Sequence, residues 1–214
     1  MFYNVHTHLT NAPQTRVLAV KNVYQNFNGD NSGQKVSMGL HPWYIDIRDP
    51  ELQFASLKHN VTRPEVVAVG ECGLDKLNST PWDLQLRVFQ WQISLAEDVN
   101  KPLIIHCVKA FQEVLSELKH VKVPVIFHGI NNKKTVIQTV IDSGYYLSFG
   151  KALLTGREYI LETFRAVPLE QVFLETDDAD VDIREIYKSA AKIKNITEKE
   201  IVLQLEQNFL TVFK

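Results

Sequence analysis

The chain has 214 residues, of which 45% are hydrophobic and 22% charged, as expected for one globular domain with a substantial core. Its formal net charge is -2, from 23 basic and 25 acidic residues, which excludes a broad polyanion-binding surface built from excess Lys and Arg. Two cysteines, Cys72 and Cys107, are too few for a disulfide framework, and the lack of a signal peptide or membrane-length apolar run predicts a cytoplasmic protein.

Short apolar runs alternate with longer segments of helical period, which is the pattern of β-strand and α-helix units around a parallel sheet. Eight runs are predicted strands, a number that favours a barrel over an open sheet: 2–8, 16–23, 35–40, 66–71, 103–106, 123–128, 145–149 and 172–175. Helices are predicted between or after the later strands: 50–58, 110–118, 133–143, 155–166 and 182–194.

Two further helices are indicated by their first residues. Thr80 and Pro81 predict an N-cap followed by proline at the first helical position. Thr197 and Glu200 have the spacing of a capping box, and the apolar residues that follow lie on one helix face.

The front of the chain departs from this rhythm. Residues 9–15 are too few for a helix with its turns, and residues 24–34 are rich in Asn, Gly, Asp and Ser, which indicates a loop. A full barrel typically takes ~250 residues. We therefore predict one domain over residues 1–214, a distorted (β/α)8 TIM-type barrel that lacks its first two outer helices. The uncovered wall suggests a homo-oligomer in which a partner subunit covers it.

Metal-competent side chains recur at the predicted strands. His6 and His8 alternate along the first strand, so both can face the same side and bind one cation. Four later strands each end at or next to such a side chain, and the ends of barrel strands are where barrel enzymes place catalytic groups: Glu71, His106, His128 and Asp177. Chance explains one such residue more easily than all of them, so the pattern predicts a metal site.

The number and type of these side chains indicate the kind of site. Six ligands exceed the four of one tetrahedral zinc and suit two adjacent divalent cations, with Glu71 placed to bridge them through its two oxygens. Imidazole mixed with carboxylate favours zinc, manganese or iron over magnesium.

Six short segments also occur in a characteristic order: NVHTHL at 4–9, GLHPW at 39–43, GECGLD at 70–75, PLIIHC at 102–107, FHG at 127–129 and LETD at 174–177. Together they resemble the TatD-like metal-dependent deoxyribonucleases of the amidohydrolase superfamily. The order and spacing match over nearly the whole chain, so the set is specific although each segment alone is not.

The resemblance implies roles for these residues. One metal would be held by His6, His8, Glu71 and Asp177, and the second by Glu71, His106 and His128. Asp177 and Glu71 would be the catalytic carboxylates. Glu71 would bind both metals, and Asp177 would also orient or deprotonate the water that attacks phosphorus. The implied substrate is DNA or a small phosphodiester, with substrate contacts expected from His41, Trp43 and Lys109.

Other interpretations stay open at this point. The same site could cleave a C–N or C–O bond of a small molecule, and the acidic residues 178–182 favour this because they place negative charge where a DNA backbone would pass. A non-catalytic metal-binding protein is the third interpretation, although the presence of Asp177, the expected base, argues against it.

Overall fold

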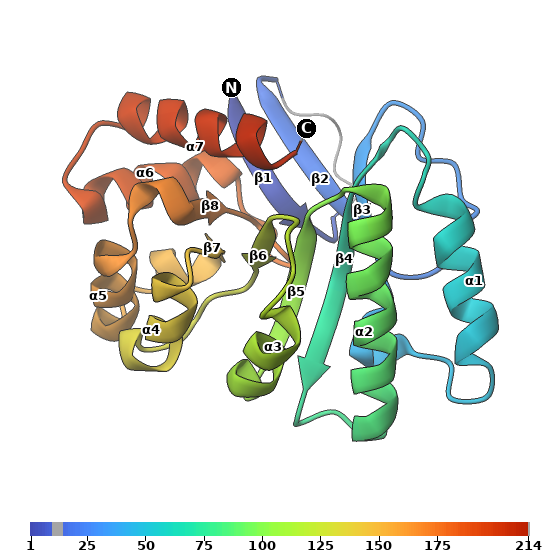
Figure 1. Cartoon of the computed structure of the whole chain (residues 1–214). Helices are drawn as coiled ribbons and strands as arrows, with labels where there is room; N and C mark the ends of the chain where they lie inside the picture. The colour runs from blue at the N-terminus through green and yellow to red at the C-terminus, as the bar shows by residue number, and fades with distance from the viewer. Residues whose placement is uncertain (10–14, 214) are drawn as a thin grey trace. The chain divides into compact units, whose positions relative to one another are not determined.

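The computed structural model describes residues 1–9 and 15–213. Eight strands follow one another in the sheet in chain order (Figure 1): β1 (Phe2–Thr7), β2 (Val17–Val23), β3 (Lys35–Met38), β4 (Val66–Asp75), β5 (Leu103–Val108), β6 (Val125–Phe127), β7 (Tyr146–Phe149) and β8 (Val172–Leu174). The β1–β2, β3–β4, β4–β5 and β7–β8 pairs are parallel. A parallel bridge also joins Thr7, at the end of β1, to Asp177, just beyond β8. This order confirms the predicted (β/α)8 barrel topology.

Seven α-helices occur in the described residues: α1 (Pro50–Asn60), α2 (Trp82–Val99), α3 (Phe111–Leu118), α4 (Lys134–Asp142), α5 (Glu158–Ala166), α6 (Ile183–Lys194) and α7 (Glu198–Val212). Short 3-10 helices are η1 (Pro42–Tyr44), η2 (Lys151–Leu154) and η3 (Leu169–Gln171). Residues 24–34, between β2 and β3, contain turns and no helix, as predicted. The predicted loop at 9–15 includes residues 10–14, which lie outside the described residues. Within the described ranges, no helix combines the length and apolar character that crossing a membrane requires.

Strand β4 is longer than predicted. Its pairing with β5 continues as far as Asp75↔Val108, so Glu71 and His106 lie inside their strands and the prediction that they close them is wrong. The register of the pair shifts between Gly70 and Cys72, on either side of Glu71. An irregularity of this kind re-aims a side chain without ending the strand, which the alternation of apolar residues alone does not reveal.

The predicted N-cap of α2 is also wrong. Pro81 is the N-cap residue, and it makes no side-chain capping bond. The hydroxyl of Thr80 instead donates to the carbonyl of Pro42 in η1 at 2.8 Å, and the Thr80 carbonyl accepts from Gln85 Nε2 at 2.8 Å. Thr80 is buried, so its polar groups are satisfied by neighbouring segments instead of the helix terminus.

The contacts divide the chain into two compact units. Unit 1 comprises Met1–Lys21 and Phe127–Lys214, and unit 2 comprises Asn22–Ile126. In unit 1, α6 and α7 pack on β1 and β8 (Figure 1). Tyr187 of α6 fixes this packing, because its buried hydroxyl accepts from the Tyr3 amide and donates to the Tyr3 carbonyl, both at 3.1 Å. The single domain over residues 1–214 stays a prediction.

Unit 2 is built around β4 and α2. The apolar stripe of α2 packs on β4, where Val88 and Phe89 are fully buried. Two buried glutamines on the same helix bind backbone: Gln92 accepts from the Leu40 amide at 2.7 Å and donates to the Leu40 carbonyl at 3.1 Å, and Gln85 accepts from the Asp75 amide at 2.9 Å. The helix thereby holds the segments that follow β3 and end β4.

The predicted capping box of α7 is present, and its loss has a defined cost. Thr197 Oγ1 accepts from the Glu200 amide at 3.2 Å, and Glu200 Oε2 accepts from the Thr197 amide at 2.7 Å. Thr197→Ala is expected to lower the free energy of unfolding by about 1 kcal/mol, measured from urea unfolding. Thr211→Ala removes a hydroxyl that bonds only within the helix, so a loss equal to that of Thr197→Ala would contradict the capping explanation.

Candidate metal centre

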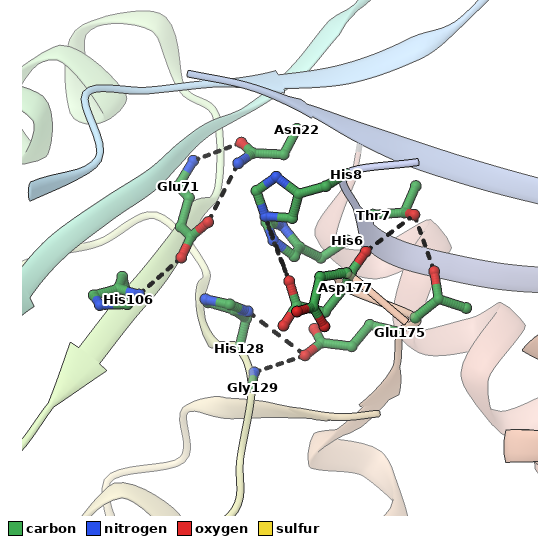
Figure 2. A network of polar contacts seen from close by, with 12 residues as sticks. His6, Thr7, His8, Asn22, Glu71, His106, His128, Gly129, Glu175 and Asp177 are labelled. Atoms are coloured by element: carbon green, nitrogen blue, oxygen red, sulfur yellow. Dashed lines mark hydrogen bonds and ion pairs between the residues drawn. The ribbon is translucent and has the colours of Figure 1, made fainter. Parts of the chain in front are cut away.

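Three predicted ligands of unit 1 converge where β1 ends and β8 leads into its loop. The Nε2 atoms of His6 and His8 are 3.3 Å apart. Oδ1 of Asp177 lies 3.4 Å from His8 Nε2 and 3.7 Å from His6 Nε2 (Figure 2). His6 is fully buried, whereas His8 and Asp177 are partly exposed. We call these three residues the first donor group.

The backbone fixes the first donor group through two hydrogen bonds. The Asp177 amide donates to the His6 carbonyl at 3.0 Å, and the His8 amide donates to the Asp177 carbonyl at 3.0 Å. Asp177 has a φ of 53°, a left-handed conformation that Asp and Asn adopt more readily than most residues. The carboxylate position is therefore set by main-chain pairing between the first and last strands.

A residue whose role the sequence does not reveal strengthens this pairing. Asn4 Nδ2 donates to Thr176 Oγ1 at 2.8 Å, and Asn4 Oδ1 accepts from the Thr176 amide at 3.0 Å. The Thr176 hydroxyl also lies 3.0 Å from the Thr7 hydroxyl. Asn4 thus clamps the residue before Asp177 with both ends of its amide.

The spacing of the first donor group fits a transition-metal ion. Zinc binds histidine nitrogen at about 2.0–2.1 Å, which places neighbouring ligand atoms of a tetrahedron about 3.3–3.4 Å apart. The three measured separations of 3.3, 3.4 and 3.7 Å are close to this value. Two imidazoles and one carboxylate also form a donor set that zinc, manganese and iron accept.

His128 lies beside the first donor group, just after β6. Its ring centroid is 4.3 Å from that of His6, and its Nδ1 is 3.5 Å from Oε1 of Glu175. The same oxygen accepts from the Gly129 amide at 2.7 Å (Figure 2). Burial acts most strongly on Glu175 and would raise its pKa, but contacts from His128, His6 and Ser148 outweigh it and hold the pKa below its ordinary value. The prediction that His128 shares a metal with Glu71 and His106 stays a prediction.

Glu175 has a role that the sequence interpretation missed. The carboxylate is fully buried and accepts from the segment that carries His128, so it orients that histidine. A buried carboxylate beside a histidine ring is a recurrent support of metal-binding histidines. The available signal was an acidic residue directly after the apolar run of β8, two positions before Asp177.

Unit 2 contains a second donor group, formed by His41, Glu71 and His106. His106 Nδ1 lies 2.8 Å from Glu71 Oε1, and His41 Nε2 lies 3.2 Å from the same oxygen. The two histidine nitrogens are 3.2 Å apart. All three side chains are nearly or fully buried. The structure thus brings together two predicted ligands, Glu71 and His106, and one predicted substrate contact, His41.

Two polar residues hold the second donor group in place. Asn22 on β2 accepts from the Glu71 amide at 3.0 Å and donates to Glu71 Oε2 at 3.2 Å (Figure 2). Asp75 Oδ2 accepts from Trp43 Nε1 at 2.7 Å and lies 3.2 Å from His106 Nε2. Burial would raise the pKa of Asp75 most strongly, but hydrogen bonds from Trp43, the Leu77 amide and His106 outweigh it and lower the pKa.

The other two predicted substrate contacts are accessible. Trp43 lies in η1 and is 52% exposed although its indole nitrogen is tied to Asp75. Lys109 follows β5 directly, is exposed and has a φ of 53°. Lys109 therefore lies three residues after His106, in the segment that leaves β5.

Loss of the Asp75 charge is expected to weaken metal binding. Asp75→Asn keeps one acceptor oxygen, which suffices for the Leu77 amide, but the NH2 group in place of Oδ2 cannot accept from Trp43 Nε1 or from His106 Nε2. We expect the affinity of the second donor group for a divalent cation to fall about 10–100-fold, measured by competition with a chromogenic chelator. Asp83→Asn, on the exposed start of α2, is the matched control. Unchanged metal affinity in Asp75→Asn would show that Asp75 stabilises only the turn in which it accepts from the Leu77 amide.

Comparisons with known proteins agree with this geometry. The TatD-related DNase family matches residues 9–214. The metal-dependent hydrolase TatD of Mycobacterium tuberculosis is 34% identical over 66% of this chain and 56% of its own length, so the match spans little more than half of that relative. The human 3'-5' RNA nuclease TATDN2 is 32% identical over 72% of this chain and 21% of its own. The crystal structure of YjjV, a TatD homologue from Escherichia coli K12, shares the fold with a TM-score of 0.85 at 20% identity, covering 99% of this chain and 97% of that chain. The chain belongs to the TatD-related DNase family.

Proposed function

We propose that this protein is a metal-dependent phosphodiesterase that hydrolyses DNA or short nucleic-acid fragments. The observation that carries the proposal is the first donor group, whose three ligand atoms lie at the mutual spacing of a metal coordination shell. The family match supports hydrolysis as the reaction, and the name of the human relative supports a phosphodiester bond as the target.

We propose that two divalent cations are held, one mainly by the first donor group and one by Glu71 and His106. Bound there, they would lower the pKa of water and stabilise negative charge on phosphate oxygens. Asp177 belongs to the first donor group and its carboxylate is partly exposed, so it can accept a proton from the attacking water. Asp75, Asn22 and Glu175 would keep the ligands oriented.

The acidic residues 178–182 repel a phosphodiester substrate less than their composition suggests, because some of their charges are paired. Asp178 Oδ1 lies 2.6 Å from Lys151 Nζ in η2. Asp182 caps α6 through the Arg184 amide and also pairs with the Arg184 guanidinium at 2.9 Å. Two of the aspartates thus face cations, which supports a phosphodiester over an uncharged small molecule. The exposed ring of Trp43 would stack on a base, and Lys109 would contact a phosphate.

Metal removal tests the proposal directly. We expect chelator-stripped protein to lose hydrolysis of bis(4-nitrophenyl) phosphate and of short single-stranded DNA by at least about 1,000-fold, because the lost charge stabilisation is worth several kcal/mol. Zinc, manganese or magnesium would be restored separately, and the most active of them should return the rate.

A pair of histidine variants serves as the control. His6→Ala removes a ligand and should not recover on metal addition, whereas His59→Ala changes an exposed histidine on α1 and should behave as wild type. Cleavage of a small-molecule amide or ester without any phosphodiester cleavage would replace this proposal with an amidohydrolase activity. Metal binding without turnover of either substrate type would indicate a non-catalytic metal-binding protein.

We also propose a cytoplasmic location, because Cys72 and Cys107 are both free thiols and burial raises the pKa of each, to about 12 for Cys107. Self-association stays a prediction.

A further inference from the structure

His41 occupies an unusual place in the second donor group, because both of its ring nitrogens have defined neighbours. The residue is buried and is the N-cap of η1. Its Nδ1 accepts a hydrogen bond from the Trp43 amide at 3.1 Å. A backbone amide can only donate, so Nδ1 must carry a lone pair. In the neutral ring the proton is therefore on Nε2.

His106 has the opposite arrangement. Its Nε2 lies 3.2 Å from Asp75 Oδ2, and an ionised carboxylate can only accept. Both oxygens of Asp75 also accept from other donors, Oδ2 from Trp43 Nε1 and Oδ1 from the Leu77 amide. His106 Nδ1 faces a second carboxylate, Glu71 Oε1, at 2.8 Å, so both ring nitrogens can donate to a carboxylate. A cation bound by Glu71 would replace the proton at Nδ1, while Asp75 would hold the other proton on Nε2. This carboxylate–histidine arrangement is the usual way in which a metal-binding histidine is oriented.

Distances alone do not separate the two histidines. His41 Nε2 and His106 Nδ1 lie 3.2 and 2.8 Å from Glu71 Oε1, and 3.2 Å from each other, so all three atoms have the spacing of ligands around one cation. The second nitrogen of each ring does separate them. Asp75 can hold a proton on His106 Nε2 and leave Nδ1 for a metal, whereas the Trp43 amide occupies the lone pair of His41 Nδ1, so the neutral ring keeps its proton on Nε2.

We propose that His41 is not a metal ligand but a fixed hydrogen-bond donor, whose Nε2–H is directed at an anionic oxygen of the substrate beside Glu71 and His106. Without substrate the same N–H faces Glu71 Oε1. The ring is oriented in advance by the Trp43 amide, so donation to a phosphate oxygen that gains charge during hydrolysis requires no reorganisation. The substrate part of this inference rests on the proposed phosphodiesterase activity.

Asparagine at position 41 separates the two roles of this side chain. Asn is a favoured N-cap residue, so His41→Asn keeps an acceptor for the Trp43 amide and removes the N–H at the Nε2 position. His106→Ala is the comparison variant, because it removes the proposed ligand next to it. Both proteins would be stripped, reloaded with zinc and analysed for bound metal, and cobalt-loaded samples would be compared by visible absorption.

We expect His41→Asn to keep the wild-type metal content and cobalt spectrum, and to lower kcat for the phosphodiester about 10²–10³-fold, as removal of one preorganised donor does. His106→Ala should lose metal. If His41→Asn loses as much metal as His106→Ala, or if its kcat is unchanged, the donor role is wrong.

The tautomer can be measured without turnover. Long-range ¹H–¹⁵N correlation spectra of metal-free protein labelled at histidine should give His41 the pattern of an Nε2-protonated ring, with His41→Asn identifying the signal. An Nδ1-protonated pattern would overturn the inference. A wild-type enzyme that binds metal but cleaves no phosphodiester would refute the proposed function and the substrate role together, while the metal content and the tautomer would still decide whether His41 is a ligand.

Discussion

Asp177→Asn is expected to lower kcat for phosphodiester hydrolysis about 10²–10⁴-fold, the range typical for loss of a catalytic base, while the protein stays folded. Asn is nearly isosteric and tolerates the φ of 53°, and the two backbone bonds that Asp177 makes to His6 and His8 do not involve its side chain. The substitution therefore removes one negative charge from the first donor group and little else.

The measurement is steady-state hydrolysis of bis(4-nitrophenyl) phosphate with metal in excess, beside a thermal unfolding curve. Asp178→Asn is the matched control, because it changes the neighbouring aspartate, whose partner is Lys151 and not a histidine. It should retain nearly all activity. Equal losses in the two variants would indicate a general charge effect of the loop and would count against a specific role for Asp177.

Gly73→Ala is expected to produce the largest loss of stability, at least about 3 kcal/mol, from overpacking and backbone strain together. A Cβ at this position would lie 2.0 Å from the carbonyl oxygen of His106, and the φ of +143° is one that side-chain-bearing residues rarely adopt. Strands β4 and β5 would have to separate where they carry Glu71 and His106, so metal affinity should fall along with stability.

Gly156→Ala is the comparison variant, because Gly156 also has a positive φ. Gly156 has a φ of +68°, but an added Cβ would meet nothing within 4 Å, so only the left-handed strain of about 1–2 kcal/mol is expected. Urea unfolding of both variants gives the two losses. If Gly73→Ala is no more destabilising than Gly156→Ala, the close approach of the two strands is not what requires glycine.

The fold class and most of the side chains that meet in the two donor groups could be predicted because each depends on a local pattern. The apolar runs predict eight strands, and His6 with His8 follows from alternation along a single strand. The position of Glu71 could not be predicted in the same way, since the register shift beside it interrupts the alternation while the strand continues to Asp75.

Residues that support the ligands were harder to predict than the ligands themselves. Asn22 lies 49 positions from Glu71, and Asn4 lies 172 positions from Thr176, so neither pair leaves a trace in local periodicity. The difference between His41 and His106 is harder still, because it depends on which atom each ring nitrogen faces. Only the folded structure determines which atom each nitrogen faces.

The division of the chain into units has a consequence for the order in which the two donor groups can form during translation. Unit 2 is one continuous stretch, Asn22–Ile126, so its donor group can assemble while translation continues. Unit 1 is discontinuous, and His6 and His8 emerge about 170 residues before Asp177, a delay of roughly 10–30 s at ordinary elongation rates. During that interval the nascent chain presents a histidine pair without its carboxylate. The complete first donor group can therefore form only after the residues of the second have been synthesised, and this order follows from the positions of the two groups along the chain.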